Sequence, residues 1–307
     1  MATLASLILD TERILYGQAR LERPKLDTGS LADDSTTSLT GLNTNLWSAQ
    51  DRAEVWPVDG SVGEIVHFTS ENAGTGTVIR GMSGTTAAAA SSQPLLKNPT
   101  HPRVTIQAEI ENVINQDLWP HVWLHSDRTL TYVIGTKIYE LNANDRHVVS
   151  MYQVVDGLRK WMPFGWWKIV QGLDSGTSST GQAVEVEKVH AADDTVYYWS
   201  RTEITTSDYA NLPADIEAAI PYMVAARLVG DYRYAKDQSD PNRQALPEVQ
   251  AGQAAQTSRQ LKAEFLRQRA DIHRRLVFDE KNMWEYRSQN RRPTNFGFHL
   301  RSRGRIS

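Results

Sequence analysis

Residues 250–276 constrain the fold most, because they predict a long helix with a narrow apolar seam. The apolar side chains recur at intervals of seven and four residues, the spacing of a coiled-coil stripe, and the other faces are polar. A long polar helix with so narrow a seam needs a partner. We expect this partner to be the apolar segment 216–228 or a neighbouring subunit. The seam consists of Ala254, Leu261, Phe265, Ile272 and Leu276.

Two other regions contain short strand-like segments separated by turns. In residues 35–97, alternating or β-branched stretches are broken by Asp59-Gly60 and Asn72-Ala73-Gly74, which favour tight turns. Several short strands within about 60 residues favour a small barrel or sandwich. A second β-rich region covers residues 130–204, whereas residues 27–34 have the composition of a loop.

Helical spacing of apolar residues recurs outside these β regions. Residues 4–15 and 103–118 are amphipathic, and Pro213 opens a further helix. No run approaches the roughly 18 consecutive apolar residues of a membrane-spanning helix, so we expect no membrane partner.

Charge is unevenly distributed along the chain. Residues 1–200 contain 15 basic and 23 acidic side chains, whereas residues 201–307 contain 18 basic and 13 acidic ones. The last 22 residues contain six arginines and no acidic residue, which is typical of an interaction arm. Interleaved apolar residues favour a protein groove as its target, and nucleic-acid phosphates are the alternative. The predicted binding residues are Arg287, Arg291, Arg292, Phe296, Phe298, Arg301, Arg303 and Arg305.

No catalytic constellation is present in the sequence. The chain has no cysteine, which excludes disulfide scaffolds, thiolate zinc fingers, iron–sulfur sites and cysteine nucleophiles. Gly81-Met82-Ser83-Gly84 lacks the lysine of a phosphate-binding loop and the spacing of a nucleophile elbow. His121 and His125 are four residues apart without the glutamate of a zinc metalloprotease. We therefore predict a protein that is not an enzyme and has no cofactor and no metal site.

Residues 161–167 form a dense aromatic cluster, Trp-Met-Pro-Phe-Gly-Trp-Trp. If exposed, these rings could stack on sugars or bases. We favour core and interface packing instead.

One segment resembles a motif of tailed-bacteriophage neck proteins. Residues 77–90, Thr-Val-Ile-Arg-Gly-Met-Ser-Gly-Thr-Thr-Ala-Ala-Ala-Ala, are similar to their V-x-R-G-x-x-G-T-T-A-A-A-H stretch, with Ala90 or Ser91 at the usual histidine. As in that group, Asn98-Pro99 and an amphipathic helix follow. The helix around 220–228 is also similar to one in head–tail connector (adaptor) proteins. The motif turn consists of Arg80, Gly81, Gly84, Thr85 and Thr86.

The resemblance implies an α+β fold with a helical bundle as its frame. Residues 1–20, 103–118 and 213–276 would form the bundle, with small β-barrel or sandwich regions inserted and an extended C-terminal arm. The expected parts are an N-terminal helix and linker (1–34), a small β domain (35–100), a bundle helix (101–129), a second β-rich domain (130–207), a C-terminal helical hairpin (208–285) and the basic arm (286–307).

The resemblance also implies a virion structural protein, assembled in the host cytoplasm and located in the neck. It would form a homo-oligomeric ring, commonly dodecameric in this family, between the portal above and a tail or stopper protein below. Genomic DNA would pass through the lumen without specific binding, because acidic side chains facing it would let the polyanion slide. The arm would clamp the portal or a neighbouring subunit.

Four other functions remain open. The chain could be the stopper or tail-completion protein of the neck, or a tail or baseplate protein that binds host glycans through Trp166 and Trp167. It could also be a metal-dependent hydrolase using His121 and His125, or a nucleic-acid binder working through the arm.

Overall fold

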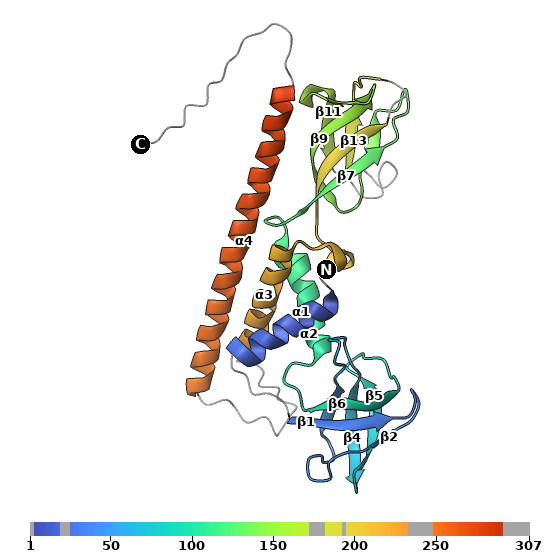
Figure 1. Ribbon diagram of the computed structural model, residues 1–307, viewed down its shortest axis with the longest axis vertical. Helices are drawn as coiled ribbons and strands as arrows, with labels where there is room; N and C mark the ends of the chain where they lie inside the picture. The colour runs from blue at the N-terminus through green and yellow to red at the C-terminus, as the bar shows by residue number, and fades with distance from the viewer. Residues whose placement is uncertain (1–2, 19–24, 172–181, 192–194, 233–247, 291–307) are drawn as a thin grey trace. The chain divides into compact units, whose positions relative to one another are not determined.

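The computed structural model describes residues 3–18, 25–171, 182–191, 195–232 and 248–290 (Figure 1). Contacts divide the chain into two units. The first combines Met1–Leu124 with Glu203–Ile272, and the second combines His125–Thr202 with His273–Ser307.

The first unit contains a closed antiparallel barrel with the strand order β1-β2-β5-β4-β3-β6. Its core is a single apolar cluster that includes Leu39, Phe68 and Leu95, and the Trp47 ring stacks on Phe68 at a centroid distance of 4.7 Å. Gly76 is required beside this core, because a Cβ there would lie 2.3 Å from the Phe68 ring. The strands are β1 (Lys25–Leu31), β2 (Ser38–Thr40), β3 (Arg52–Val55), β4 (Ile65–Asn72), β5 (Thr75–Met82) and β6 (Ala90–Lys97).

Three helices of the same unit contact one another: α1 (Leu4–Arg13), α2 (Arg103–Val113) and α3 (Ala214–Tyr232). Helix α1 begins with a capping box in which the Thr3 and Ser6 side chains each accept from the other's backbone N–H. Single π-helical turns, η1 (Ile14–Gln18) and η2 (Ile114–Leu118), continue α1 and α2. The buried apolar faces of α1 and α2 include Leu7, Ile8, Ile106 and Ile110, which explains the helical spacing seen in the sequence. A 3₁₀ segment, η4 (Thr206–Asn211), precedes α3.

The second unit contains two sheets that share one core, with the orders β10-β9-β13-β7 and β11-β12-β8. Met151 and Tyr198 from the first sheet and Trp167 and Val184 from the second belong to this core. The elements are β7 (Leu124–Leu130), β8 (Ile138–Glu140), β9 (Asp145–Val155), β10 (Leu158–Trp161), η3 (Phe164–Trp166), β11 (Trp167–Gln171), β12 (Gln182–Val186) and β13 (Val196–Thr202).

Helix α4 (Glu248–Asn290) contains the predicted seam and is longer than the sequence spacing indicated. Leu261, Phe265, Ile272 and Leu276 are each no more than 6% exposed, whereas Ala254, the fifth predicted member, is only half-buried. In the first unit, Ser258 Oγ donates to the Ala226 carbonyl of α3 at 2.6 Å. Helix α3 is therefore a partner of α4 within the chain, one of the two expected alternatives.

The predicted helical-bundle frame is wrong. The described residues are about 37% helical, and they contain a closed six-stranded barrel and two further sheets. Each β region encloses an apolar core of its own, so neither is a decoration carried by helices. None of the described helices combines the length and the hydrophobicity needed to cross a bilayer.

Candidate functional site

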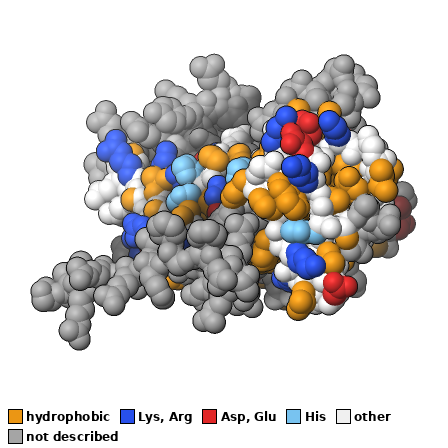
Figure 2. Space-filling view, turned by 90° about the horizontal axis from the view of Figure 1, so that it is seen from above, with side chains coloured by type: hydrophobic (Ala, Val, Ile, Leu, Met, Phe, Trp, Pro, Cys, Tyr) orange, Lys and Arg blue, Asp and Glu red, His pale blue; other side chains and the backbone are white. Residues whose placement is uncertain are grey.

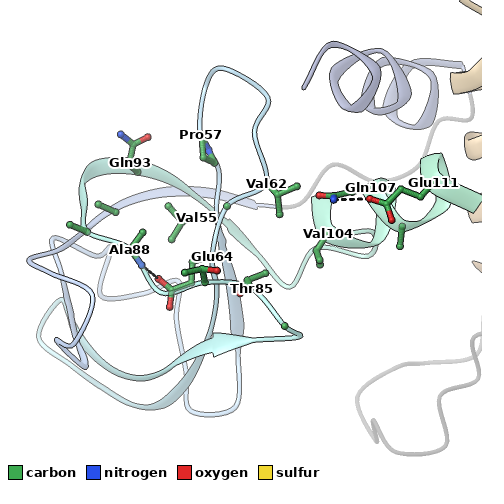
Figure 3. Close-up of a pocket in the computed structure, with 16 residues that line it drawn as sticks. Val55, Pro57, Val62, Glu64, Thr85, Ala88, Gln93, Val104, Gln107 and Glu111 are labelled. Atoms are coloured by element: carbon green, nitrogen blue, oxygen red, sulfur yellow. Dashed lines mark hydrogen bonds between the residues drawn. The ribbon is translucent and has the colours of Figure 1, made fainter. Parts of the chain in front are cut away.

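A groove of about 690 Å³ lies between the barrel and helix α2, entirely within the first unit (Figure 3). We call it the α2 groove. Its barrel side includes Val55, Gly63 and Glu64, followed by five residues of the β5–β6 connection between positions 84 and 89 and by Ala90 at the start of β6. Helix α2 contributes the side chains of Val104, Gln107, Ala108 and Glu111. Small side chains thus form much of the wall, and the lining contains no lysine or arginine.

A buried ion pair between Arg80 and Glu64 organises the barrel side of the groove. Arg80 donates from Nε and Nη2 to the two Glu64 carboxylate oxygens at 2.7 and 2.6 Å, and their side chains are 8% and 3% exposed. The same carboxylate accepts from the backbone N–H groups of Gly81 and Ala88 at 2.8 and 3.2 Å. Hydrogen bonds from Arg80 to Glu64 raise the pKa of the guanidinium, against a smaller opposing effect of burial. The charges of Arg80 and Glu64 thus neutralise each other and hold the end of β5 in place.

The remaining motif residues lie at the end of β5 and in the turn that follows it. Gly81 and Gly84 have φ angles of +65° and +79°, which favour glycine, and Ser83 between them has +57°. Thr85 Oγ1 accepts from the Ile65 N–H at 3.0 Å and donates to the Met82 carbonyl at 2.7 Å. Of the five motif residues singled out from the sequence, Arg80 and Gly81 lie near the end of strand β5, and Gly84, Thr85 and Thr86 lie in the turn after it and line the groove.

A second buried arginine holds α2 against the barrel. Arg103, 1% exposed, donates from Nε to Glu12 Oε1 at 2.7 Å, and its backbone N–H donates to Glu54 Oε1 at 2.8 Å. Its guanidinium also lies 4.7 Å from the centroid of the Trp56 ring. Sequence reasoning missed Arg103, although a basic residue in the first turn of a helix, where the macrodipole disfavours a cation, was a signal.

Burial raises the pKa of Glu54 to about 7, with the Arg103 N–H and charge opposing this effect. The neighbouring Glu12 carboxylate raises it further. Glu54 lies in the barrel–α2 joint and does not line the groove.

The two carboxylates that line the α2 groove are both engaged in hydrogen bonds. Glu64 is saturated with hydrogen bonds, and Glu111 Oε1 accepts from Gln107 Nε2 at 2.9 Å. Within the ranges that the structure describes, no group of three His, Asp or Glu residues could hold a metal ion. Neither His121 nor His125 lines the groove, and His125 Nε2 lies 2.9 Å from Glu280 in the second unit.

In the second unit, Glu280 of α4 binds two residues of the four-stranded sheet. Arg201 donates to both carboxylate oxygens at 2.8 and 2.6 Å, and His125 contacts one of them. Burial opposes ionisation, but the hydrogen bonds from His125 and Arg201 outweigh it and lower the pKa of Glu280 to about 2. This cluster fastens the C-terminal part of α4 to the sheet.

The aromatic residues 161–167 do not form one surface. Trp167 is buried in the core shared by the two sheets, and Trp166 packs against His190 at a centroid distance of 4.8 Å. Trp161 contacts Tyr152 and Trp199 at 4.9 and 5.6 Å. Figure 2 shows one face of the molecule, where hydrophobic, basic and histidine side chains are interspersed among the described residues in view.

The predicted arm lies almost wholly outside the described residues. This applies to Arg291, Arg292, Phe296, Phe298, Arg301, Arg303 and Arg305. Arg287 lies in helix α4, but its side chain is outside what the structure describes.

Comparison with protein-family models finds no match, and comparison with curated proteins finds no relative of significant similarity.

Proposed function

We propose that this chain is a structural protein of the neck of a tailed bacteriophage. It forms an adaptor ring that joins the portal to the tail and surrounds the DNA exit channel. Its partners are the portal, a tail or stopper protein, and further copies of itself. It performs no chemistry on the DNA that passes through it.

One observation carries this proposal. The two segments that resemble neck proteins, residues 77–90 and the helix after Asn98-Pro99, are neighbours in space and line the same groove. Their charged residues serve structure, through Arg80–Glu64 and Arg103–Glu12, and the space between them is lined by small side chains suited to a protein segment.

The proposal does not depend on a helical-bundle frame. It rests on the motif turn, the α2 groove and the opposite charges of the body and the arm. A net negative body suits a conduit for DNA, because strong attraction to the polyanion would slow its passage.

Electron microscopy of virions and of the purified full-length protein tests the proposal. We expect a ring with a central hole at the head–tail junction, located by a label fused to this chain. Direct contact of the ring with the portal identifies the adaptor, whereas a ring one layer further down identifies the stopper. A label on the distal tail or baseplate, or absent from the virion, contradicts the proposal.

A further inference from the structure

The α2 groove has the size and lining of a docking site for an extended peptide. Its volume of about 690 Å³ lies within the range of pockets that enclose a ligand. Gly84, Ala88, Ala89 and Ala108 have little or no side chain to fill it, and all four are exposed. The wall formed by α2 between Val104 and Glu111 is about 10 Å long at 1.5 Å per residue.

One segment of this chain has the complementary pattern. Phe296, Phe298 and Leu300 alternate with Gly297 and His299, and period-two alternation is typical of an extended chain with one apolar face. An extended stretch from Phe296 to Leu300 spans about 13 Å, close to the length of the α2 wall. Two aromatic rings and a leucine side chain supply the bulk that the groove wall lacks.

The charges also match. The groove lining has no basic side chain, and its available acidic residue is Glu111, since the Glu64 carboxylate is already paired with Arg80. Arg301, Arg303 and Arg305 follow the apolar stretch directly, with no acidic residue in the last 22 positions. Opposite charges at the rim of an interface speed association and fix the direction of the bound segment.

We propose that the α2 groove binds residues 296–300 of a neighbouring copy of this chain. The inference rests on the proposed ring, since the ring supplies the neighbour. Phe296 and Phe298 are the apolar anchors, and the arginines after them meet Glu111 of helix α2. Each copy thus carries one groove and one arm, which is the head-to-tail arrangement that closes a ring.

The absence of cysteine allows a direct test in the full-length protein, because every introduced thiol is unique. Two single variants, Ala108→Cys in the groove and His299→Cys in the arm, which leaves both anchor phenylalanines in place, are mixed and treated with a short thiol-reactive crosslinker. Size differences from a tag on one variant distinguish mixed from identical pairs. The matched control replaces Ala108→Cys by Thr75→Cys, an exposed position on β5 that does not line the groove.

We expect the Ala108→Cys and His299→Cys pair to link roughly tenfold more than the control pair, since binding raises the effective concentration of the thiols. Ala89→Trp, placed at an exposed groove residue so that folding is retained, should reduce linking to the control level. Equal linking in both pairs overturns the inference. So does a link formed only within one chain that carries both substitutions.

The result is separable from the test of the proposed function. A labelled ring at the head–tail junction without the mixed crosslink rejects the groove–arm contact and leaves the neck assignment intact. A mixed crosslink without a ring at that junction supports the groove–arm contact and rejects the neck assignment.

Discussion

At the scale of single residues, buried charge pairs hold the α2 groove in shape. Arg80 and Glu64 stabilise the motif turn, and Arg103, Glu12 and Glu54 join α1, α2 and the barrel. A buried pair adds little net stability compared with apolar packing, but removing one partner strands the other charge. The pairs should therefore be sensitive to substitutions that change few atoms.

Glu64→Gln tests the first pair. The substitution leaves the Arg80 guanidinium buried without a carboxylate, so we expect the free energy of unfolding to fall by about 3–5 kcal/mol. Chemical denaturation measures the change. Glu185→Gln is the matched control, because Glu185 pairs with the largely exposed Lys168 and should contribute at most about 1 kcal/mol. An equally small effect at Glu64 would show that the turn does not depend on the pair.

Glu54 predicts a pH dependence of stability. Its pKa rises from the ordinary 4.5 to about 7 in the folded protein, so the folded state holds a proton that the unfolded state releases between these values. Stability should therefore fall as pH rises from about 4.5 to 7, by on the order of 3 kcal/mol, and then level off.

Glu54→Gln keeps an acceptor for the Arg103 N–H and removes the titration. Denaturation of both proteins between pH 4.5 and 8 isolates the contribution of Glu54 as the difference between the two curves. Parallel curves would contradict the raised pKa.

At the scale of elements, α4 depends on tertiary contacts for its position. Most of the side chains of this helix are polar, and the buried ones form a single narrow seam. In the first unit the helix is fixed by that seam, by the Ser258 bond to α3 and by a bond from Arg269 to the Asp117 carbonyl at 2.9 Å. A long polar helix gains most of its stability from such packing.

Phe265→Ala tests the seam. Phe265 is buried, so the cavity and lost transfer free energy should destabilise the protein by about 3–5 kcal/mol and increase hydrogen exchange across the N-terminal half of α4. Leu266→Ala, one position along and 39% exposed, is the control and should cost less than about 1 kcal/mol. Similar losses at both positions would mean that the helix is not held by this seam.

The strands of the barrel were predicted only in part from local sequence patterns. The sequence indicated the hairpin turns at Asp59-Gly60 and Asn72-Ala73-Gly74, and the structure has β4 and β5 on either side of the latter. It missed β1, because Lys25–Leu31 contains turn-forming residues such as Asp27 and Gly29. Pairing with β2 and β6 closes the barrel and overrides that local preference.

At the scale of the whole molecule, an acidic body and a basic arm predict separable roles. Deleting residues 287–307 should leave folding intact, because the packed cores lie elsewhere. Circular dichroism and thermal unfolding measure the fold, and attachment to portal-containing capsids measures function. We expect attachment to be lost, whereas normal attachment by the shortened protein would remove the arm from the mechanism.

Replacing the six arginines of residues 287–307 by glutamine separates charge from chain length. If charge complementarity drives attachment, this variant should also fail to attach to capsids. Attachment of the unmodified protein should then weaken as the salt concentration rises. Attachment that is insensitive to both changes would assign the arm's role to its apolar residues alone.

Short-range information was sufficient for part of this protein. The sequence alone determined the charge asymmetry and the absence of cysteine chemistry, because both are properties of composition. It also determined the seam of α4 and the motif turn, because residue spacing within one helix or one turn is local information. Only the tertiary structure decided that the β regions have cores of their own and that residues 77–90 and α2 enclose one groove. The partners that build it are far apart in the chain, 91 residues for Arg103 and Glu12 and 16 for Arg80 and Glu64. Such pairings depend on how whole elements pack, which local periodicity does not record.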